Sequence, residues 1–228
     1  ALAWESSGTR RAYWLLCAGV ILLADIFTFS RGGYAGLFFG SSAFLLPLFL
    51  QSGIGKRYIF RIGTGGFIIL ALILASPVGT RLFSSFSQSD GSNIERLRLW
   101  QEAGAAIASH PVLGLGLGNY PLAVKPSALY REPIYAHNLF LDITLETGLV
   151  GFSLFSIFLL LGIVSAWRRW RQEKTAFFLA AFSALIVFSV HAFFETPLFS
   201  VHILPLFLLV MAVSLAPIRK ELPPQLSL

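Results

Sequence analysis

The chain has 228 residues, of which 56% are hydrophobic and 12% are charged, and its net charge at pH 7 is +6. A mean hydropathy of +0.74 excludes an ordinary soluble domain, whose share of charged residues is about 25%. Most basic residues flank apolar runs, so the positive charge indicates membrane topology and excludes nucleic-acid binding as its main purpose. The single cysteine, Cys17, forms no internal disulfide and excludes zinc motifs with paired cysteines.

Six apolar stretches approach the roughly 20 residues that a membrane-spanning helix needs. They are residues 12–29, 34–50, 59–76, 149–167, 176–194 and 198–217. We therefore expect an all-α, polytopic bundle of about six transmembrane helices. The chain has no initiator Met and no signal-peptide pattern, so we expect its first residues to lie inside a longer protein.

Basic residues cluster at every second connection between these stretches. The clusters are Arg10 and Arg11; Lys56, Arg57 and Arg61; Arg168, Arg169, Arg171 and Lys174; and Arg219 and Lys220. The positive-inside rule then places both ends of the chain in the cytoplasm. We predict three spans in residues 1–76, a large outward loop with two short helices in residues 77–148, and three spans with a short cytoplasmic tail in residues 149–228.

The first loop helix is predicted at residues 94–108, after a polar stretch at 84–93. Its apolar positions follow three- and four-residue spacing at Leu97, Trp100, Gly104 and Ala108, with Arg96 off that stripe. Such a helix is expected to lie at the membrane surface.

A glycine-rich segment at residues 114–120 comes next, followed by a second loop helix. The segment follows no strand and lacks the Lys-Ser/Thr of a phosphate loop, so we expect a turn that packs on the membrane. The second helix is predicted to begin near His137 and to stop at Gly148. Arg96 and His137 are then placed to face one cavity.

Three cations lie on the outward side, where the positive-inside rule predicts few: Arg31, Arg96 and Arg98. A guanidinium grips phosphate oxygens with two parallel hydrogen bonds, so this excess favours an anionic ligand. The alternatives are that Arg31 extends to lipid head groups and that Arg98 is simply solvated. Asp25 lies at membrane depth, and pairing with Arg31 would satisfy it.

His137 has the side chain that is best suited to act as a base near neutral pH. A carboxylate such as Asp142 or Glu146 would orient it. His191 and Glu195, four residues apart on one expected helical face, form a second candidate pair, although a kink before a proline explains them nearly as well. No His/Cys/Asp cluster has metal-ligand spacing, so we expect neither a metal nor another cofactor.

Five motifs in order resemble those of the O-antigen ligase and polymerase family. They are Ser30-Arg31-Gly32, Arg96-Leu97-Arg98-Leu99-Trp100, the run from His110-Pro111 to Gly116, Ala136-His137-Asn138-Leu139-Phe140-Leu141, and Glu146-Thr147-Gly148-Leu149-Val150-Gly151. The resemblance implies a multi-pass protein of the bacterial inner membrane with a large periplasmic loop. Members carry ten or more helices, so the chain resembles their carboxy-terminal half.

The resemblance further implies transfer of a glycan from a polyprenyl-diphosphate carrier to a glycan, lipid or protein acceptor. By it, His137, Arg96 and Arg31 are the expected catalytic residues. The candidate substrate-binding residues are Arg98, Asn138, Glu146, His191 and Glu195. The expected partners are therefore this carrier-linked donor, the acceptor and membrane lipids, without nucleic acid.

Two other functions remain open from the residues alone. A transporter or channel would use Asp25, His191 and Glu195 as a polar pathway, but the chain has no internal repeat and no clearly broken helix. A protein that only binds the carrier-linked glycan would need the arginines and would not need His137.

Overall fold

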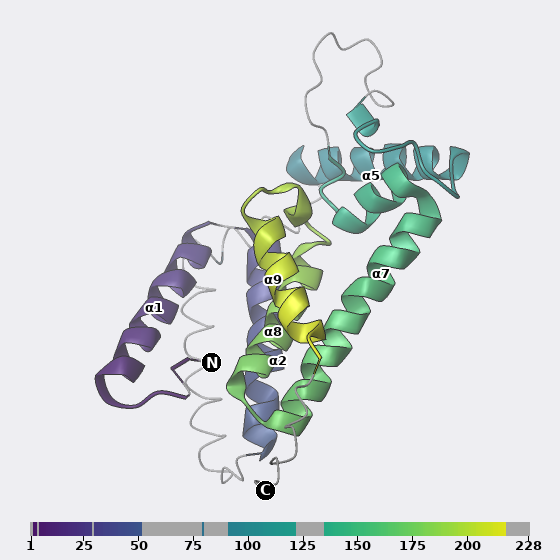
Figure 1. Cartoon of the computed structure of the whole chain (residues 1–228). Helices are drawn as coiled ribbons and strands as arrows, with labels where there is room; N and C mark the ends of the chain where they lie inside the picture. Colours follow the sequence, from purple (N-terminus) through teal and green to yellow (C-terminus); the bar gives the residue numbers. More distant parts are fainter. Residues whose placement is uncertain are drawn as a thin grey trace, which may run out of the picture.

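The computed structural model describes residues 2–3, 5–28, 30–51, 79, 91–121 and 135–217, and within them every regular element is a helix (Figure 1). These elements are α1 (Gly8–Phe27), α2 (Arg31–Gln51), α5 (Gly91–Ser109), α7 (Leu139–Glu173), α8 (Ala176–His191), the 3-10 helix η1 (Pro197–Phe199) and α9 (Ile203–Leu215). The all-α prediction is confirmed for this part of the chain. The span predicted at 59–76 and the basic clusters at 56–61 and 219–220 lie outside the described residues.

The chain is a helical membrane protein. Among the described helices, α2 and α7 are long and apolar enough to cross a bilayer, and α8 and α9 are apolar but shorter. Large apolar side chains are widely exposed, for example Leu16 on α1, Leu154 on α7 and Leu209 on α9, each at least 60% accessible. Soluble proteins rarely expose such continuous apolar surface, whereas lipid tails cover it without cost.

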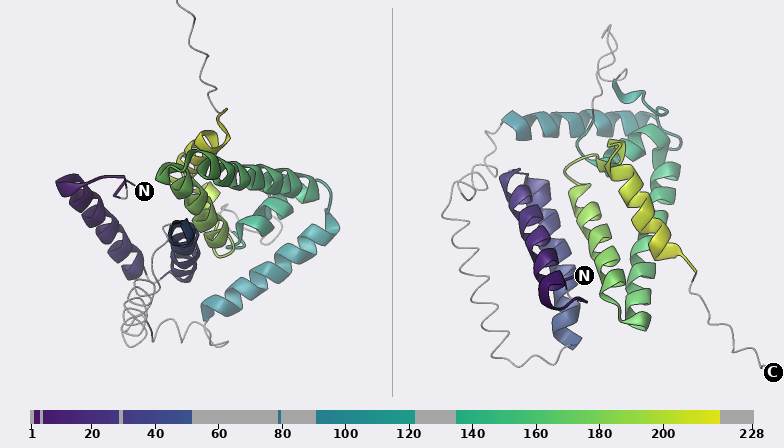
Figure 2. Two further views of the ribbon diagram at one scale, coloured as in Figure 1. Left: turned by 90° about the horizontal axis from the view of Figure 1, so that it is seen from below. Right: turned by 60° about the vertical axis from the view of Figure 1, so that its left-hand side comes forward.

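Helices α2, α7, α8 and α9 form a bundle, α1 stands beside it, and α5 lies across one end (Figures 1 and 2). This end, called the α5 end below, also holds the start of α2, the start of α7 and the connection from α8 to α9. The start of α1 and the connection from α7 to α8, with basic residues at 168–174, lie at the other end. α1 and α8 thus run toward the α5 end, whereas α2, α7 and α9 run away from it.

A glycine stripe on α2 allows it to pack closely against α8. The stripe consists of Gly32, Gly36 and Gly40. A Cβ atom at Gly36 would lie 3.3 Å from Val187 Cγ1, and one at Gly32 would lie 3.2 Å from His191 Nδ1. Small residues let two apolar helices approach and maximise their van der Waals contact. The first turn of α2, including Arg31, is therefore fixed beside the last turn of α8.

α7 is bent at Gly148, whose φ of 66° and ψ of −171° are not helical. This divides α7 into a head, residues 139–147, and the apolar part that begins at Leu149 and was predicted to span the membrane. The prediction that the loop helix stops at Gly148 is confirmed. A second helical segment continues directly from it.

The glycine-rich segment packs on this bend, in an arrangement called the glycine crossing (residues 111–118 with 145–150). Leu115 and Gly116 donate backbone hydrogen bonds to the carbonyls of Leu145 (2.8 Å) and Glu146 (2.9 Å). A Cβ atom at Gly114 would lie 2.5 Å from the Glu146 carbonyl carbon. The segment is a packing turn, as expected, and it packs on α7; its contact with the membrane stays a prediction.

Two predicted boundaries are wrong, and α5 has a second apolar face that was not predicted. α8 ends at His191 and α9 begins at Ile203, and the connection between them contains η1, which Pro197 starts because a residue without an N–H is suited to the first position of a helix. On α5, Leu99 and Ala103 are buried while Leu97 is 56% exposed. The helix thus has two apolar faces: the predicted stripe is the exposed one, and Leu99 and Ala103 lie on a second, buried one.

Candidate functional site

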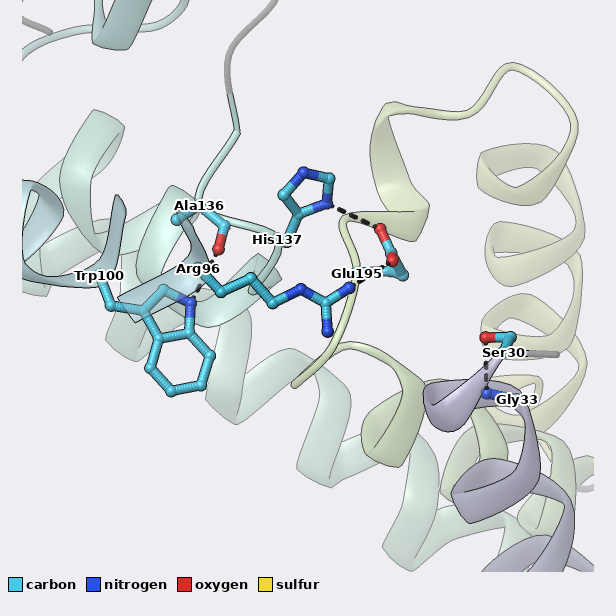
Figure 3. A network of polar contacts seen from close by, with 7 residues as sticks. All are labelled: Ser30, Gly33, Arg96, Trp100, Ala136, His137 and Glu195. Atoms are coloured by element: carbon cyan, nitrogen blue, oxygen red, sulfur yellow. Dashed lines mark hydrogen bonds and ion pairs between the residues drawn. The ribbon is translucent and has the colours of Figure 1, made fainter. Parts of the chain in front are cut away.

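Three side chains from three elements meet at the α5 end, and we call them the polar trio: Arg96, His137 and Glu195. Arg96 Nη2 lies 3.0 Å from Glu195 Oε1, and His137 Nδ1 lies 3.0 Å from Glu195 Oε2 (Figure 3). The side chains are 24%, 45% and 39% exposed, respectively. The trio is thus internally paired and still accessible to a ligand.

Arg96 reaches the trio because α5 is docked on the α7 head. Ala103 of α5, Tyr120 and Leu145 belong to one buried apolar cluster. The Tyr120 hydroxyl also donates to the Leu99 carbonyl at 3.2 Å. Burial raises the pKa of Tyr120 to about 12, so this donor keeps its proton at physiological pH. The cluster fixes the rotation of α5 and turns Arg96 toward Glu195.

His137 stands immediately before α7 in the left-handed backbone region, with a φ of 51°. The next residue, Asn138, caps the helix: its Oδ1 accepts from the backbone N–H groups of Phe140 (3.1 Å) and Leu141 (3.2 Å). Asn138, a candidate substrate-binding residue, is thus held as the cap of α7. This leaves the side chain of His137 outside the helix, where it contacts Glu195.

Glu195 lies in the turn that follows α8. Its backbone N–H donates to the His191 carbonyl at 3.1 Å, and its own carbonyl accepts from Leu139 N–H at 3.2 Å. The expectation that His191 and Glu195 share a helical face is wrong, because α8 ends at His191. Instead, His191 lies against Gly32 of α2 and Glu195 joins the polar trio. Residues 191–195 therefore connect the start of α2 to the trio.

The two carboxylates expected to orient His137 have other bonding partners in the described part of the chain. Asp142 Oδ1 accepts from the Ala136 N–H at 2.8 Å, and Glu146 Oε1 accepts from the Gly118 N–H at 3.1 Å. Burial raises the pKa of Asp142 to about 6 and also raises that of Glu146, although each N–H donor opposes the shift. Glu195 is the carboxylate that contacts the His137 ring.

The remaining candidates lie around the trio. Arg98 is on the opposite face of α5, where it pairs with Glu95 at 2.6 Å and with Glu102 at 3.8 Å. Arg31 is the first residue of α2, in the turn where Ser30 Oγ accepts from Gly33 N–H at 3.1 Å, and Figure 3 shows this turn in the region of the trio. Asp25 lies at the same turn, since a Cβ atom at Gly33 would be 2.8 Å from its Oδ1.

The part of the chain that the structure describes contains no group of three or more His, Cys, Asp or Glu side chains placed to hold a metal ion. The contact between His137 and Glu195 was missed from the sequence, which paired Glu195 with His191. The two residues are 58 positions apart, and no local spacing rule connects them.

The model of the O-antigen ligase family matches residues 14–156, more than half of the chain. A Rickettsia bellii protein named "Putative polysaccharide ligase" is 29% identical over 136 residues, which cover 55% of this chain and 33% of the relative. A Rickettsia felis protein of the same name is 28% identical over 160 residues, covering 66% of this chain and 39% of the relative. The chain thus spans between a third and two fifths of the length of these relatives. Arg31, Arg96 and His137 lie inside the matched range, and Glu195 lies outside it.

Proposed function

Because this chain belongs to the O-antigen ligase family, we propose that it forms part of an inverting membrane glycosyltransferase that takes its glycan from a polyprenyl-diphosphate carrier. One observation carries the proposal: Glu195 holds both a guanidinium and an imidazole at one end of the helix bundle. A transfer reaction of this kind requires a cation for the diphosphate and a base for the acceptor hydroxyl, and the polar trio contains both.

The arginines act on the leaving group. The bond from the anomeric carbon to the diphosphate breaks during transfer, and negative charge grows on the departing phosphate oxygen. Arg96 lies in the trio and Arg31 starts α2 at the same end of the bundle, so both are positioned to offset this charge. Arg96 uses one guanidinium nitrogen, Nη2, for Glu195, while an arginine presents five N–H donors in total.

His137 acts on the acceptor. The Glu195 carboxylate accepts a hydrogen bond from Nδ1–H and so selects the tautomer whose Nε2 carries a lone pair. Nε2 then removes the proton from the acceptor hydroxyl as its oxygen bonds to the anomeric carbon from the side opposite the diphosphate. The configuration is inverted, and proton removal contributes about 10² to 10⁴ to the rate. No step calls for a metal ion or a nucleotide.

We further propose that the enzyme lies in a bacterial inner membrane with the α5 end toward the periplasm. The basic residues at 10–11 and 168–174 lie at the opposite end, as the positive-inside rule requires of the cytoplasmic side. The domain scheme of three spans, a periplasmic loop at 77–148 and three further spans belongs to the same proposal. Glycan, lipid and protein acceptors all present the hydroxyl that this chemistry needs.

A transfer assay with purified protein in liposomes and an undecaprenyl-diphosphate-linked glycan as donor tests the proposal. We expect Arg96→Ala and His137→Ala each to lower turnover by about 10²-fold or more. Carrier binding, measured separately, should weaken in Arg96→Ala and persist in His137→Ala. Near-parental turnover in both variants would contradict the assignment. Weaker carrier binding in Arg96→Ala, with no transfer by the parent protein, would indicate a glycan-binding protein instead.

A further inference from the structure

The residue that precedes His137 is held through both its backbone N–H and its backbone carbonyl. Trp100 Nε1 donates to the Ala136 carbonyl at 2.8 Å, and the Ala136 N–H donates to Asp142 Oδ1 at 2.8 Å. Ala136 is fully buried and Asp142 is 2% exposed, so water has little access to the bond between them, whereas the bond from Trp100, which is 37% exposed, is only partly buried. We call Trp100, Ala136 and Asp142 the Ala136 clamp.

The clamp lies where the backbone is strained. A φ of 51° at a non-glycine residue costs free energy on the order of 1 to 3 kcal/mol and persists only where surrounding contacts enforce it. On one side of His137 the clamp fixes Ala136, and on the other side Asn138 is fixed as the cap of α7. These bonds together hold His137 in the conformation that points its ring at Glu195 (Figure 3).

The clamp also links the base to the cation. Trp100 lies four residues after Arg96 on α5, so both side chains project from the same side of that helix. Arg96 contacts Glu195 while Trp100 contacts the residue before His137. A rigid helix therefore sets the separation between the group that binds the diphosphate and the group that removes the proton.

We infer that Trp100 and Asp142 are positioning residues for His137 and act on turnover through the backbone N–H and carbonyl of Ala136. This inference rests on the proposed function and deepens it. A displacement of about 1 Å at a reacting group costs up to about 10²-fold in rate, so loss of either bond should lower kcat far more than it changes KM.

Three variants in the liposome transfer assay, with the same undecaprenyl-diphosphate-linked donor, test the inference. Trp100→Phe keeps the aromatic ring and removes the N–H, and Asp142→Leu removes the acceptor. Both should lower kcat about 10- to 100-fold with little change in the KM for donor. Asp142→Asn keeps an oxygen that accepts from Ala136 and should restore turnover to within about threefold of the parent.

Tyr120→Phe is the matched control, because it keeps the ring in the apolar cluster that docks α5 and removes only the hydroxyl's bond to Leu99, while both backbone bonds of Ala136 remain. It should leave kcat near the parental value. In a His137→Ala background, Trp100→Phe should cause no further loss, since it acts through the histidine.

Two results would overturn the inference in favour of a general effect on folding. One is that Trp100→Phe lowers kcat in the His137→Ala background by the same factor as in the parent protein. The other is that Tyr120→Phe lowers kcat as much as Trp100→Phe does. Equal kcat in Asp142→Leu and Asp142→Asn would also overturn it. Parental turnover in His137→Ala would instead refute the proposed function. Parental turnover in Trp100→Phe alongside an impaired His137→Ala would refute only the positioning role.

Discussion

The polar trio and the glycine crossing lie at the same end of the bundle and satisfy their polar groups in opposite ways. In the crossing, backbone groups of residues 111–118 bond directly to backbone groups at the α7 bend, and no room remains for a side chain at Gly148. In the trio, one carboxylate is shared by two side chains that are still partly exposed. A ligand can replace side-chain pairs of this kind, whereas it cannot enter a tight backbone contact without unfolding it. The crossing therefore stabilises the fold, and the trio is the candidate site.

Gly148→Ala should have the largest effect of these variants, and the property that it changes is the free energy of unfolding. Its φ of 66° disfavours any side chain, and an added Cβ would collide with the Val112 carbonyl. We expect a destabilisation above about 3 kcal/mol, seen as loss of folded protein in thermal unfolding of the detergent-solubilised chain. Gly104→Ala, in an open position of α5, is the control and should be neutral or stabilising by up to about 1 kcal/mol. A melting temperature of Gly148→Ala equal to that of the parent would show that the crossing does not stabilise the fold.

Glu195→Gln should have the next largest effect, and the property that it changes is turnover in the transfer assay. A neutral amide has one acceptor oxygen, so it cannot accept from both Arg96 and His137 with the strength of a carboxylate. Transfer should fall by about 10-fold or more while the melting temperature changes little. Glu173→Gln is the matched control, since it breaks a similar pair with Arg169 (3.1 Å) at the opposite end. The same loss of turnover in both variants would remove the distinction between the trio and an ordinary ion pair.

Arg98→Ala should have the smallest effect. Arg98 is about half exposed and its charge is already offset by Glu95 and Glu102, so its loss should leave the melting temperature nearly unchanged. Turnover should stay within about threefold of the parent, in contrast to Arg96→Ala two residues away on the same helix. A loss of transfer as large as that of Arg96→Ala would extend the candidate site to the outer face of α5.

Much of the local structure was predictable because it depends on neighbours in the sequence. Apolar runs predicted the apolar helices of the part of the chain that the structure describes. Gly148 marked the bend because few other residues adopt a positive φ. The boundaries at residues 191 and 203 were predicted less well, because the effect of Pro197 extends to a whole connecting turn.

The site was predicted only in part. Residue chemistry and the family resemblance selected Arg31, Arg96 and His137 as candidates. The sequence paired His137 with Asp142 or Glu146, which are close in the chain, whereas the folded chain pairs it with Glu195. The contact of Trp100 with Ala136 was not foreseen either, because the two residues are 36 positions apart in the chain.

The sequence by itself determined that this is a helical membrane protein, which of its residues are cations in unusual places, and where its backbone must bend. These properties follow from hydrophobicity, charge and allowed dihedral angles, all of which are local. Only the tertiary structure decided which carboxylate meets His137 and which face of α5 is turned inward. Those contacts depend on the packing of helices far apart in the chain, where several apolar faces and several acids compete for the same partner.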